Sequence, residues 1–241
     1  MPYENRNYRN YSASDGLVSF TFAVKDTDLF ISAERKLEKE ALDAAVQARY
    51  ILETYIQARP EFQTSLVPIA EDLFAPPLVQ AMLQAATLCS VGPMAAVAGA
   101  VADYVGAELL KYSGEVIVEN GGDIFFKISR PITVGIFAGP SLLSERIGLK
   151  IEPSGEPFGI CTSSGTVGPS LSFGMADAAT IRARTAALAD AAASAVGNAV
   201  KSADDIQKAL DLGQSLGCID GIVIIKDDKL GVWGNMELAG I

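Results

Sequence analysis

The sequence predicts an α+β fold in which antiparallel sheets pack against helices. Three observations support this prediction. Segments in which apolar residues alternate with polar or small ones lie near both ends of the chain and are typical of hairpins. Apolar residues at helical spacing dominate several segments between them. Strands and helices do not alternate regularly, which argues against a parallel sheet. No segment repeats at a fixed period, which argues against a repeat protein.

The first half of the chain is expected to form a hairpin followed by helices. Alternating Val18, Phe20 and Phe22 indicate the first strand, and Pro60 ends the first helix. Gly99 and Gly106 mark helix faces that another backbone can approach closely. The expected segments are strands 18–24 and 29–33 and helices 35–59, 77–89 and 94–112.

The second half is expected to contain short strands, two helices and a closing hairpin. Thr185 is a suitable N-cap for an Ala-rich helix that follows it. Short turns between the strands indicate antiparallel pairing. The expected segments are strands 115–119, 124–128, 132–138, 146–151, 178–183, 221–226 and 229–233 and helices 186–200 and 204–212.

Composition narrows the class of protein. The chain has 241 residues, 49% of them hydrophobic, and a net charge of −10, which disfavours a nucleic-acid partner because phosphate binding needs clustered Lys and Arg. Residues 73–102 carry no charge, but Pro and Gly interrupt them, so two buried helices explain them better than a membrane span. Residues 1–14 are expected to be a tail without a signal peptide, and 15–241 a single cytoplasmic domain.

Cysteine and histidine content restricts the chemistry. Cys89, Cys161 and Cys218 match neither a zinc site nor a disulfide framework, so reduced and inert thiols are expected. The sequence contains no histidine, which excludes a His general base, a Ser-His or Cys-His pair and an ordinary zinc site. Any metal is therefore expected to be Mg²⁺ or Ca²⁺ bound by oxygen atoms.

A run of small and polar residues, CTSSGTVGPSLSFGMAD, occupies positions 161–177. Three interpretations remain open for it: a flexible linker, a backbone-lined ligand cradle, or tight turns that allow close packing. Thr162, Ser163, Ser164 and Gly165 offer successive hydroxyls and unhindered amides, a composition typical of an anion-binding nest.

Two further motifs contain acidic residues that need an explanation. In ENGGDI, Asn120, Gly121 and Gly122 are typical of a hairpin turn, whereas Asp123 flanks that turn on a strand expected to be buried. In ADAAASAVGN, Asp190 and Ser194 are four residues apart and share a helix face. A buried Asp190 needs a cation, unless the helix face is solvated or Arg182 or Arg184 pairs with it.

Together, VAGAVAD (97–103), VENGGDI (118–124), GICTSSG (159–165) and LADAAASAVGN (188–198) resemble the ApbE superfamily of Mg²⁺-dependent FAD:protein FMN transferases. VGPMAAVAGAVAD, ENGGDI and TSSGTVGPSLSFGMAD resemble more closely an uncharacterised ApbE-like family of bacteria and archaea. The resemblance implies the ApbE-like, T-fold-related arrangement of antiparallel sheets and helices.

The same resemblance implies roles for individual residues. It makes Asp190 a magnesium-binding aspartate with Ser194 as a second ligand, and it places Asp123 with Asn120, Gly121 and Gly122 near the nucleotide. Asp103 takes the acidic position of the transferase KGxxxD element, in which Ala98 replaces the Lys. Asp190 and Asp123 are thus the expected catalytic residues. The expected ligand-binding residues are Asp103, Asn120, Gly121, Gly122, Thr162, Ser163, Ser164 and Gly165.

Two hypotheses of function follow. In the first, the chain binds FAD, FMN, a nucleotide or another phosphorylated ligand with Mg²⁺, and is a transferase-like enzyme. In the second, it is a non-catalytic protein on the same fold that is structural or binds a small ligand. A homodimer is expected in both, because the Gly- and Ala-rich helices 94–110 and 186–200 exceed what one sheet can cover.

Overall fold

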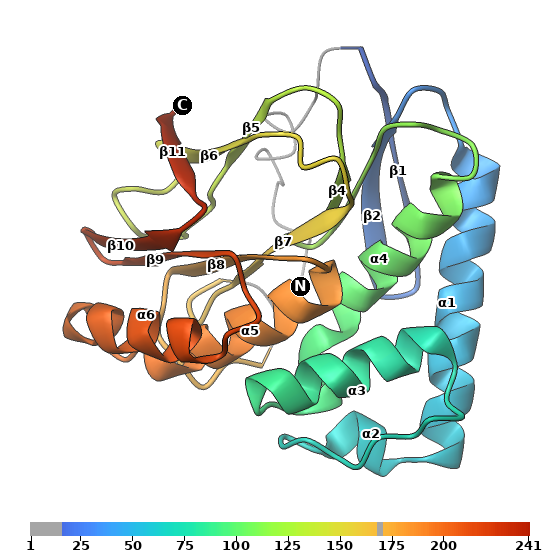
Figure 1. Cartoon of the computed structure of the whole chain (residues 1–241), viewed down its shortest axis with the longest axis horizontal. Coiled ribbons are helices and arrows are strands. Elements are labelled where there is room, and N and C mark those ends of the chain that lie inside the picture. Colours follow the sequence, from blue (N-terminus) through green and yellow to red (C-terminus); the bar gives the residue numbers. More distant parts are fainter. Residues whose placement is uncertain (1–15, 168–170) are drawn as a thin grey trace.

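The computed structural model describes residues 16–167 and 171–241, and its main element is an eight-stranded sheet (Figure 1). Every neighbouring pair of strands in this sheet is antiparallel. The strand order in space is β1 (Val18–Val24), β2 (Thr27–Ala33), β3 (Val116–Asn120), β4 (Asp123–Lys127), β7 (Phe158–Ser163), β8 (Ala178–Ala183), β9 (Gly221–Lys226) and β10 (Lys229–Gly234).

The connectivity of this sheet repeats. In each half a hairpin is followed by helices and then by a second hairpin, first in β1 to β4 and again in β7 to β10. The repeat has no fixed period in the sequence because the two helical segments differ in length, spanning residues 38–109 and 186–215. The helices are α1 (Glu38–Ala58), α2 (Glu61–Thr64), α3 (Pro77–Cys89), η2 (Pro93–Ala96), α4 (Val97–Leu109), α5 (Ala186–Ala199), η3 (Ala203–Asp205) and α6 (Ile206–Ser215).

The two faces of the sheet are covered differently. The helices pack on one face, where the larger apolar cluster lies (Figure 1). The other face is covered by a three-stranded sheet of β5 (Ile132–Gly135), β6 (Ile147–Ile151) and β11 (Glu237–Gly240). A second apolar cluster, which includes Phe126, Leu149 and Ile151, fills the space between the two sheets. The predicted α+β class with antiparallel sheets and helices is therefore confirmed.

Most predicted elements are present, but two strands and the short helix α2 were not predicted. The sequence did not indicate β7 or β11, and Cys161, Thr162 and Ser163 belong to β7 instead of to a loop. The hydroxyl of Thr185 accepts a hydrogen bond from the amide of Leu188 at 3.2 Å, which confirms the predicted N-cap. The flexible-linker interpretation of 161–177 is wrong at its start, because those residues pair with β8.

A close crossing of α4 and α5 depends on glycine. A Cβ atom on Gly99 would lie 2.2 Å from the carbonyl oxygen of Ala186, and one on Gly159 would lie 2.3 Å from the Cα atom of Ala186. Any side chain at either position would force α5 away from α4 or from β7. The predicted close approach at Gly99 is confirmed, and it brings the starts of the two helices together.

The long uncharged segment folds as two helices. Within residues 16–167 and 171–241, no single helix has the length and apolar character needed to cross a membrane. The pair formed by Pro77–Cys89 and Pro93–Leu109 meets those criteria only jointly, and its two helices are bent by 107° at the break.

Candidate functional site

Two carboxylates connect α4 and α5 at their N-terminal ends. Asp103 of α4 accepts hydrogen bonds from the amides of Ala186 and Ala187, both at 2.9 Å, which are the first two residues of α5. Asp190 of α5 accepts a hydrogen bond from the amide of Gly99, in the first turn of α4, at 3.0 Å. Each helix thus places a carboxylate at the other's N-terminus, where free amides and the helix dipole favour negative charge.

Burial dominates the electrostatics of these carboxylates. Both aspartates retain some exposed surface, but protein atoms surround their carboxylates closely enough to desolvate them. Burial raises the pKa of Asp103 to about 6, although its two amide partners oppose the shift. Burial also raises the pKa of Asp190 well above its usual value; the charge of Asp123 adds to this, and the amides of Gly99 and Ala98 oppose it. Both carboxyl groups therefore resist ionisation more than an exposed Asp does.

Asp123 enters the same site from the central sheet. It lies opposite Cys161 in the β4–β7 pairing, and only 9% of its surface is exposed. Burial raises the pKa of Asp123 to about 7, and the charge of Glu119 adds to the shift, whereas hydrogen bonds from Cys161 and the Thr162 amide oppose it. Because the charge of Asp123 contributes to the raised pKa of Asp190, the two carboxyl groups lie within electrostatic reach of each other.

The β3–β4 turn contacts the start of α4. Gly121 and Gly122 have φ values of 68° and 110°, which other residues rarely adopt, and Asn120 pairs with Asp123 across the turn. The predicted hairpin is therefore confirmed. The side-chain amide of Asn120 donates to the carbonyl oxygen of Ala98 at 3.1 Å, so the turn lies beside the Asp190 hydrogen bond to α4.

Two amides of the Thr162–Gly165 segment are used within the protein. The Thr162 amide donates to the carbonyl of Gly122 at 3.2 Å, and the Gly165 amide donates to the carbonyl of Ala176 at 2.8 Å. The expected anion-binding nest is therefore corrected at these two positions, since neither amide is available to a ligand. A Cβ atom on Gly165 would lie 2.1 Å from the carbonyl oxygen of Gly174, which supports the tight-turn interpretation.

The hydroxyl groups of the segment differ in their partners. The Thr162 hydroxyl bonds with that of Thr180 at 2.9 Å. The Ser164 hydroxyl accepts from the amides of Thr166 and Val167 at 3.1 and 3.0 Å, which closes the turn. Residues 168–170, within the 161–177 run, lie outside the described residues.

One face of α5 carries the remaining candidate ligands. Asp190, Ser194 and Gly197 follow one another at helical spacing, so they share a face. A Cβ atom on Gly197 would lie 3.6 Å from the Ser163 hydroxyl oxygen, which places the end of β7 beside that face. The α5 face, the start of α4, the β3–β4 turn and the end of β7 therefore adjoin one another, and together they make up the candidate site.

Asp190 has no cationic partner among the described residues. The guanidinium of Arg182 lies over the Phe158 ring, 4.4 Å from its centroid, and Arg184 is exposed. The alternative in which either arginine neutralises Asp190 is therefore wrong. Within the described chain no group of three or more His, Cys, Asp or Glu side chains is placed to bind a metal. One carboxylate with a neighbouring hydroxyl suits Mg²⁺, which keeps several water ligands.

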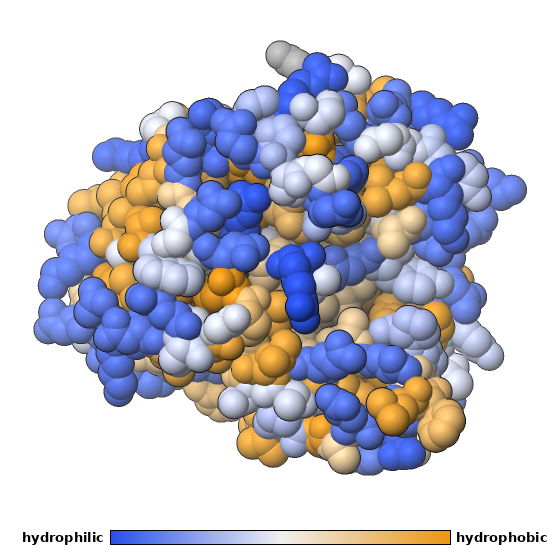
Figure 2. Space-filling model, viewed as in Figure 1, coloured by the Kyte–Doolittle hydropathy of each residue, from blue (hydrophilic) through white to orange (hydrophobic). Residues whose placement is uncertain are grey.

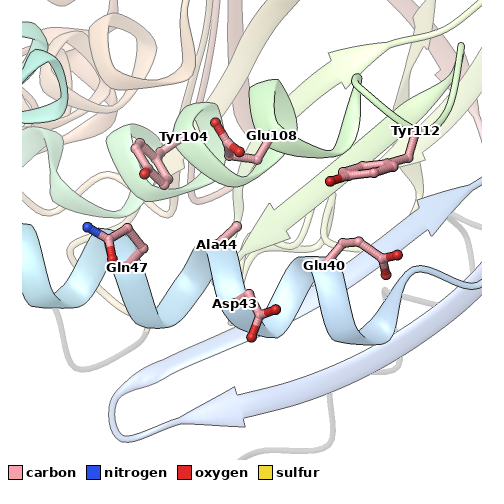
Figure 3. A pocket seen from close by; sticks show the side chains of 7 residues that line it. All are labelled: Glu40, Asp43, Ala44, Gln47, Tyr104, Glu108 and Tyr112. Carbon is pink, nitrogen blue, oxygen red and sulfur yellow. The ribbon is translucent and has the colours of Figure 1, made fainter.

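Two surface cavities lie elsewhere on the molecule. A groove of about 210 Å³ lies between α1 and α4, and Figure 3 shows its lining residues, with Glu40 and Asp43 on α1 and Tyr104 and Glu108 on α4. A second cavity, of about 300 Å³, is lined by Ser141, Leu142, Asp177, Asp227 and other residues. None of the predicted site residues lines either one. Figure 2 shows a recess near the centre of the visible face, over the region where Figure 1 draws α4 and the adjoining end of α5.

Three residues at or near the site have contacts that the sequence did not indicate. Cys161, expected to be inert, donates from its thiol to the carbonyl of Ala186 at 3.2 Å and lies beside Asp123. Asp177 is 1% exposed and accepts from the Thr166 hydroxyl at 3.0 Å and the Asp227 amide at 2.7 Å, so it holds the 164–167 turn against the β9–β10 hairpin. Gly99 was singled out for packing, and its amide also binds Asp190.

Comparison with known proteins agrees with this architecture. The sequence profile of a family described as AbpE bacteria matches residues 9–232. The UPF0280 protein of Methanosarcina barkeri is 39% identical over 218 residues, which are 89% of this chain and 86% of that protein. The UPF0280 protein of Methanocaldococcus jannaschii is 38% identical over 219 residues, covering 88% of this chain and 89% of that one.

Solved structures share the fold at low sequence identity. The flavin transferase ApbE from Vibrio cholerae has a TM-score of 0.57 at 12% identity, covering 90% of this chain and 96% of that one. The apo form of the Pseudomonas stutzeri flavinyl transferase ApbE has a TM-score of 0.57 at 14% identity, covering 90% and 94%. These likenesses confirm the predicted ApbE-like fold.

Proposed function

From the premise that this chain belongs to the AbpE bacteria family, we propose that it binds a flavin, a nucleotide or another phosphorylated ligand together with a divalent cation. The observation that carries the proposal is Asp190, a carboxylate surrounded by protein atoms that accepts the Gly99 amide at 3.0 Å, with the Ala98 amide nearby, and has no cationic partner among the described residues. Burying such a charge is costly unless a cation neutralises it. The flavin transferase titles of its structural neighbours favour a flavin among these ligands.

Each residue of the site has a role in the proposal. Asp190 and the Ser194 hydroxyl, one helical turn apart, are the cation ligands. Asp123 is the second acidic group, and its raised pKa allows it to exchange a proton near neutral pH. Ser163, Gly121 and Gly122 border the ligand, and no atom outside the adjacent residues lies within 4 Å of a Cβ atom built on Gly121.

A bound Mg²⁺ would offset phosphate charge and polarise a phosphoryl oxygen, chemistry that needs no histidine. The finer part of the proposal is therefore that the chain is a transferase that moves part of a bound flavin or nucleotide to an acceptor. We further propose that Asp103 acts through position, because both of its oxygens hold the start of α5, on which Asp190 lies.

A second candidate function has its own supporting observation. The amides of Thr162 and Gly165 are already bonded to protein carbonyls, as expected of a packing device. In this alternative the chain is a non-catalytic protein that is structural or binds a small ligand on the same fold. The homodimer remains a prediction in both cases, and a mass measured by light scattering at micromolar concentration tests it.

A thermal-shift experiment tests the main proposal. FAD, FMN and ATP are each added with and without Mg²⁺ to the wild-type chain, Asp190→Asn and Asp43→Asn. Asp43 is an exposed residue of α1, so its variant removes one charge away from the site. We expect at least one ligand to raise the melting temperature of the wild type and Asp43→Asn by about 5 to 10 °C at saturation, and only with Mg²⁺.

Asp190→Asn is expected to lose that Mg²⁺-dependent shift. Its melting temperature without ligand should be unchanged or raised, because the substitution removes a desolvated charge and keeps the shape of the side chain. A Mg²⁺-dependent shift that persists in Asp190→Asn would refute the cation assignment. A wild-type chain that responds to none of the ligands would favour the non-catalytic alternative.

A further inference from the structure

An exposed apolar strip borders α3. It is the connection between α2 and α3, residues 65–76, which Figure 1 draws below α3, at an edge where Figure 2 shows apolar surface. The exposed fractions of its large side chains are 58% for Leu66, 64% for Val67, 77% for Leu73 and 99% for Phe74. Single exposed apolar residues are common on protein surfaces, but a run of them marks an interaction site. The 65–76 strip is therefore a candidate interface.

The 65–76 strip is held against both ends of α3. The side-chain amide of Gln80, in the first turn of α3, donates to the carbonyl oxygens of Leu73 and Ala75 at 2.9 and 2.8 Å. Near the other end, a Cβ atom on Gly92 would lie 1.9 Å from the carbonyl oxygen of Ser65. Because α3 has 13 residues, the strip is about 20 Å long. Its apolar side chains are thus exposed on a fixed backbone, and a pre-ordered surface loses less entropy on binding.

The helices on which the sequence-based expectation of a dimer depends are covered within the chain. The Gly and Ala residues of α4 and α5 are mostly buried, because the two helices pack on each other and α5 also packs on β7 and β8. A dimer of this chain would therefore need another surface. The 65–76 strip contains Phe74, which is the most exposed large apolar side chain among the described residues.

The area of the 65–76 strip is sufficient to bind a second copy of the chain. Its four large apolar side chains together expose roughly 500 Å². Two copies that pair the same strip across a twofold axis would cover about 1,000 Å², which is the size at which specific interfaces begin. Apolar side chains would then face apolar side chains, so the strip is complementary to itself.

Charge disfavours a membrane as the occupant of this surface. Residues 60–110 contain no Lys or Arg, whereas Glu61, Glu71 and Asp72 lie in the strip or close to it in sequence. The guanidinium of Arg59, the nearest base in the sequence, lies 4.0 Å from Glu61 and 3.7 Å from Asp72. Binding to an anionic lipid surface depends on clustered Lys and Arg. A surface without them, in a chain with a net charge of −10, suits a protein partner better.

We propose that the 65–76 strip is the interface of a twofold-symmetric homodimer, with Phe74 as its main anchor. Large aromatic side chains that become fully covered carry much of the binding energy of an interface. Leu66, near the other end of the strip, is expected to contribute less, because it is smaller and already partly covered. This inference does not rest on the proposed function, because none of the candidate site residues belongs to the strip.

Sedimentation equilibrium at micromolar concentrations tests the proposal on the wild-type chain, Phe74→Asp, Leu66→Asp and Leu142→Asp. Leu142 is 71% exposed in the connection between β5 and β6 of the three-stranded sheet, so its variant makes the same change away from the strip. We expect the wild type and Leu142→Asp to be dimers whose dissociation constants agree within about twofold. Phe74→Asp should weaken the dimer at least about 100-fold, and Leu66→Asp about tenfold.

A wild-type chain that stays monomeric over this concentration range would overturn the proposal. A dimer that both Phe74→Asp and Leu66→Asp leave intact would overturn it as well, because the interface would then lie elsewhere. Flotation with phosphatidylcholine vesicles, with and without phosphatidylglycerol, tests the membrane alternative. A monomer that binds these vesicles and loses that binding in Phe74→Asp would assign the strip to a membrane and overturn the dimer. Far-UV circular dichroism checks that each variant keeps the wild-type fold, as expected for changes at exposed positions.

Discussion

Asp103 and Asp190 occupy matching places on α4 and α5, yet their hydrogen bonds differ. Asp103 uses both oxygens to accept the amides of Ala186 and Ala187 and so completes the first turn of α5. Asp190 accepts the Gly99 amide on one oxygen, lies close enough to the Ala98 amide for that group to favour its charge, and shares its helix face with Ser194. Both oxygens of Asp103 thus hold the start of α5, whereas Asp190 is the carboxylate that we propose binds a cation. Local sequence does not separate the two, because each lies in a helix rich in Ala and small residues.

The largest effect is expected from truncating the structural carboxylate. Asp103→Ala leaves the Ala186 and Ala187 amides without acceptors, so we expect the free energy of unfolding to fall by about 3 kcal/mol. Asp190→Ala should lower it by less than about 1 kcal/mol, because the loss of the bonds from the α4 amides is offset by the loss of a desolvated charge. Urea unfolding of the two variants at pH 7 without Mg²⁺ measures both.

Asp43→Ala is the surface control for that experiment and should change the unfolding free energy by less than about 0.5 kcal/mol. The comparison fails if Asp190→Ala destabilises the chain as much as Asp103→Ala does. In that case both carboxylates are caps, and Asp190 has no capacity left for a cation.

The pH dependence of stability provides a second, smaller effect. Asp103 and Asp123 have pKa values of about 6 and about 7 in the folded chain, against an ordinary value of 3.8. The folded chain therefore holds more protons than the unfolded chain between about pH 4 and pH 7, so this contribution to stability is present in acid and is lost as the pH rises. We expect the unfolding free energy without Mg²⁺ to fall by at least about 1 kcal/mol from pH 5 to pH 7.5.

Asp123→Asn should reduce that slope, because it removes the carboxyl group with the pKa of about 7. Chemical denaturation at four or five pH values in one buffer system measures the slope of each variant. A slope that is the same in the wild type and in Asp123→Asn would contradict the raised pKa of this residue. The exposed carboxylate of Asp43 serves again as a control, and Asp43→Asn should keep the wild-type slope.

Much of the fold was predictable because its elements are encoded locally. The hairpin turn at Asn120–Gly122, the Thr185 N-cap and the close approach at Gly99 each follow from residue types whose conformational preferences act over a few residues. β7 was missed because it runs into small polar residues, and its edges are stabilised by β4 and β8 instead of by its own pattern. The duplicated topology was not visible because the helical segments of the two halves differ in length.

The sequence predicted which residues lie near the candidate site better than it predicted their hydrogen bonds. Motif resemblance brought Asp103, Asp123 and Asp190 into one list, and they do lie within electrostatic reach of one another. Which amides and hydroxyls are already occupied depends on sheet register and helix crossing, which local sequence does not specify. The Thr162 amide bonds to Gly122 only because β4 and β7 are neighbours.

The smallest effect is expected from Ser194, the second oxygen of the proposed cation site. Ser194→Ala removes a hydroxyl but no charge, so Mg²⁺ binding in the presence of the stabilising ligand should weaken about three- to tenfold, whereas Asp190→Asn should weaken it at least about 100-fold. Mg²⁺ titrations followed by melting temperature give both values. Ser215→Ala, at an exposed position of α6, is the matched control and should bind as the wild type does. If Ser194→Ala and Ser215→Ala respond alike, the cation does not use this face of α5, and the difference between Asp190 and Asp103 needs an explanation other than a metal.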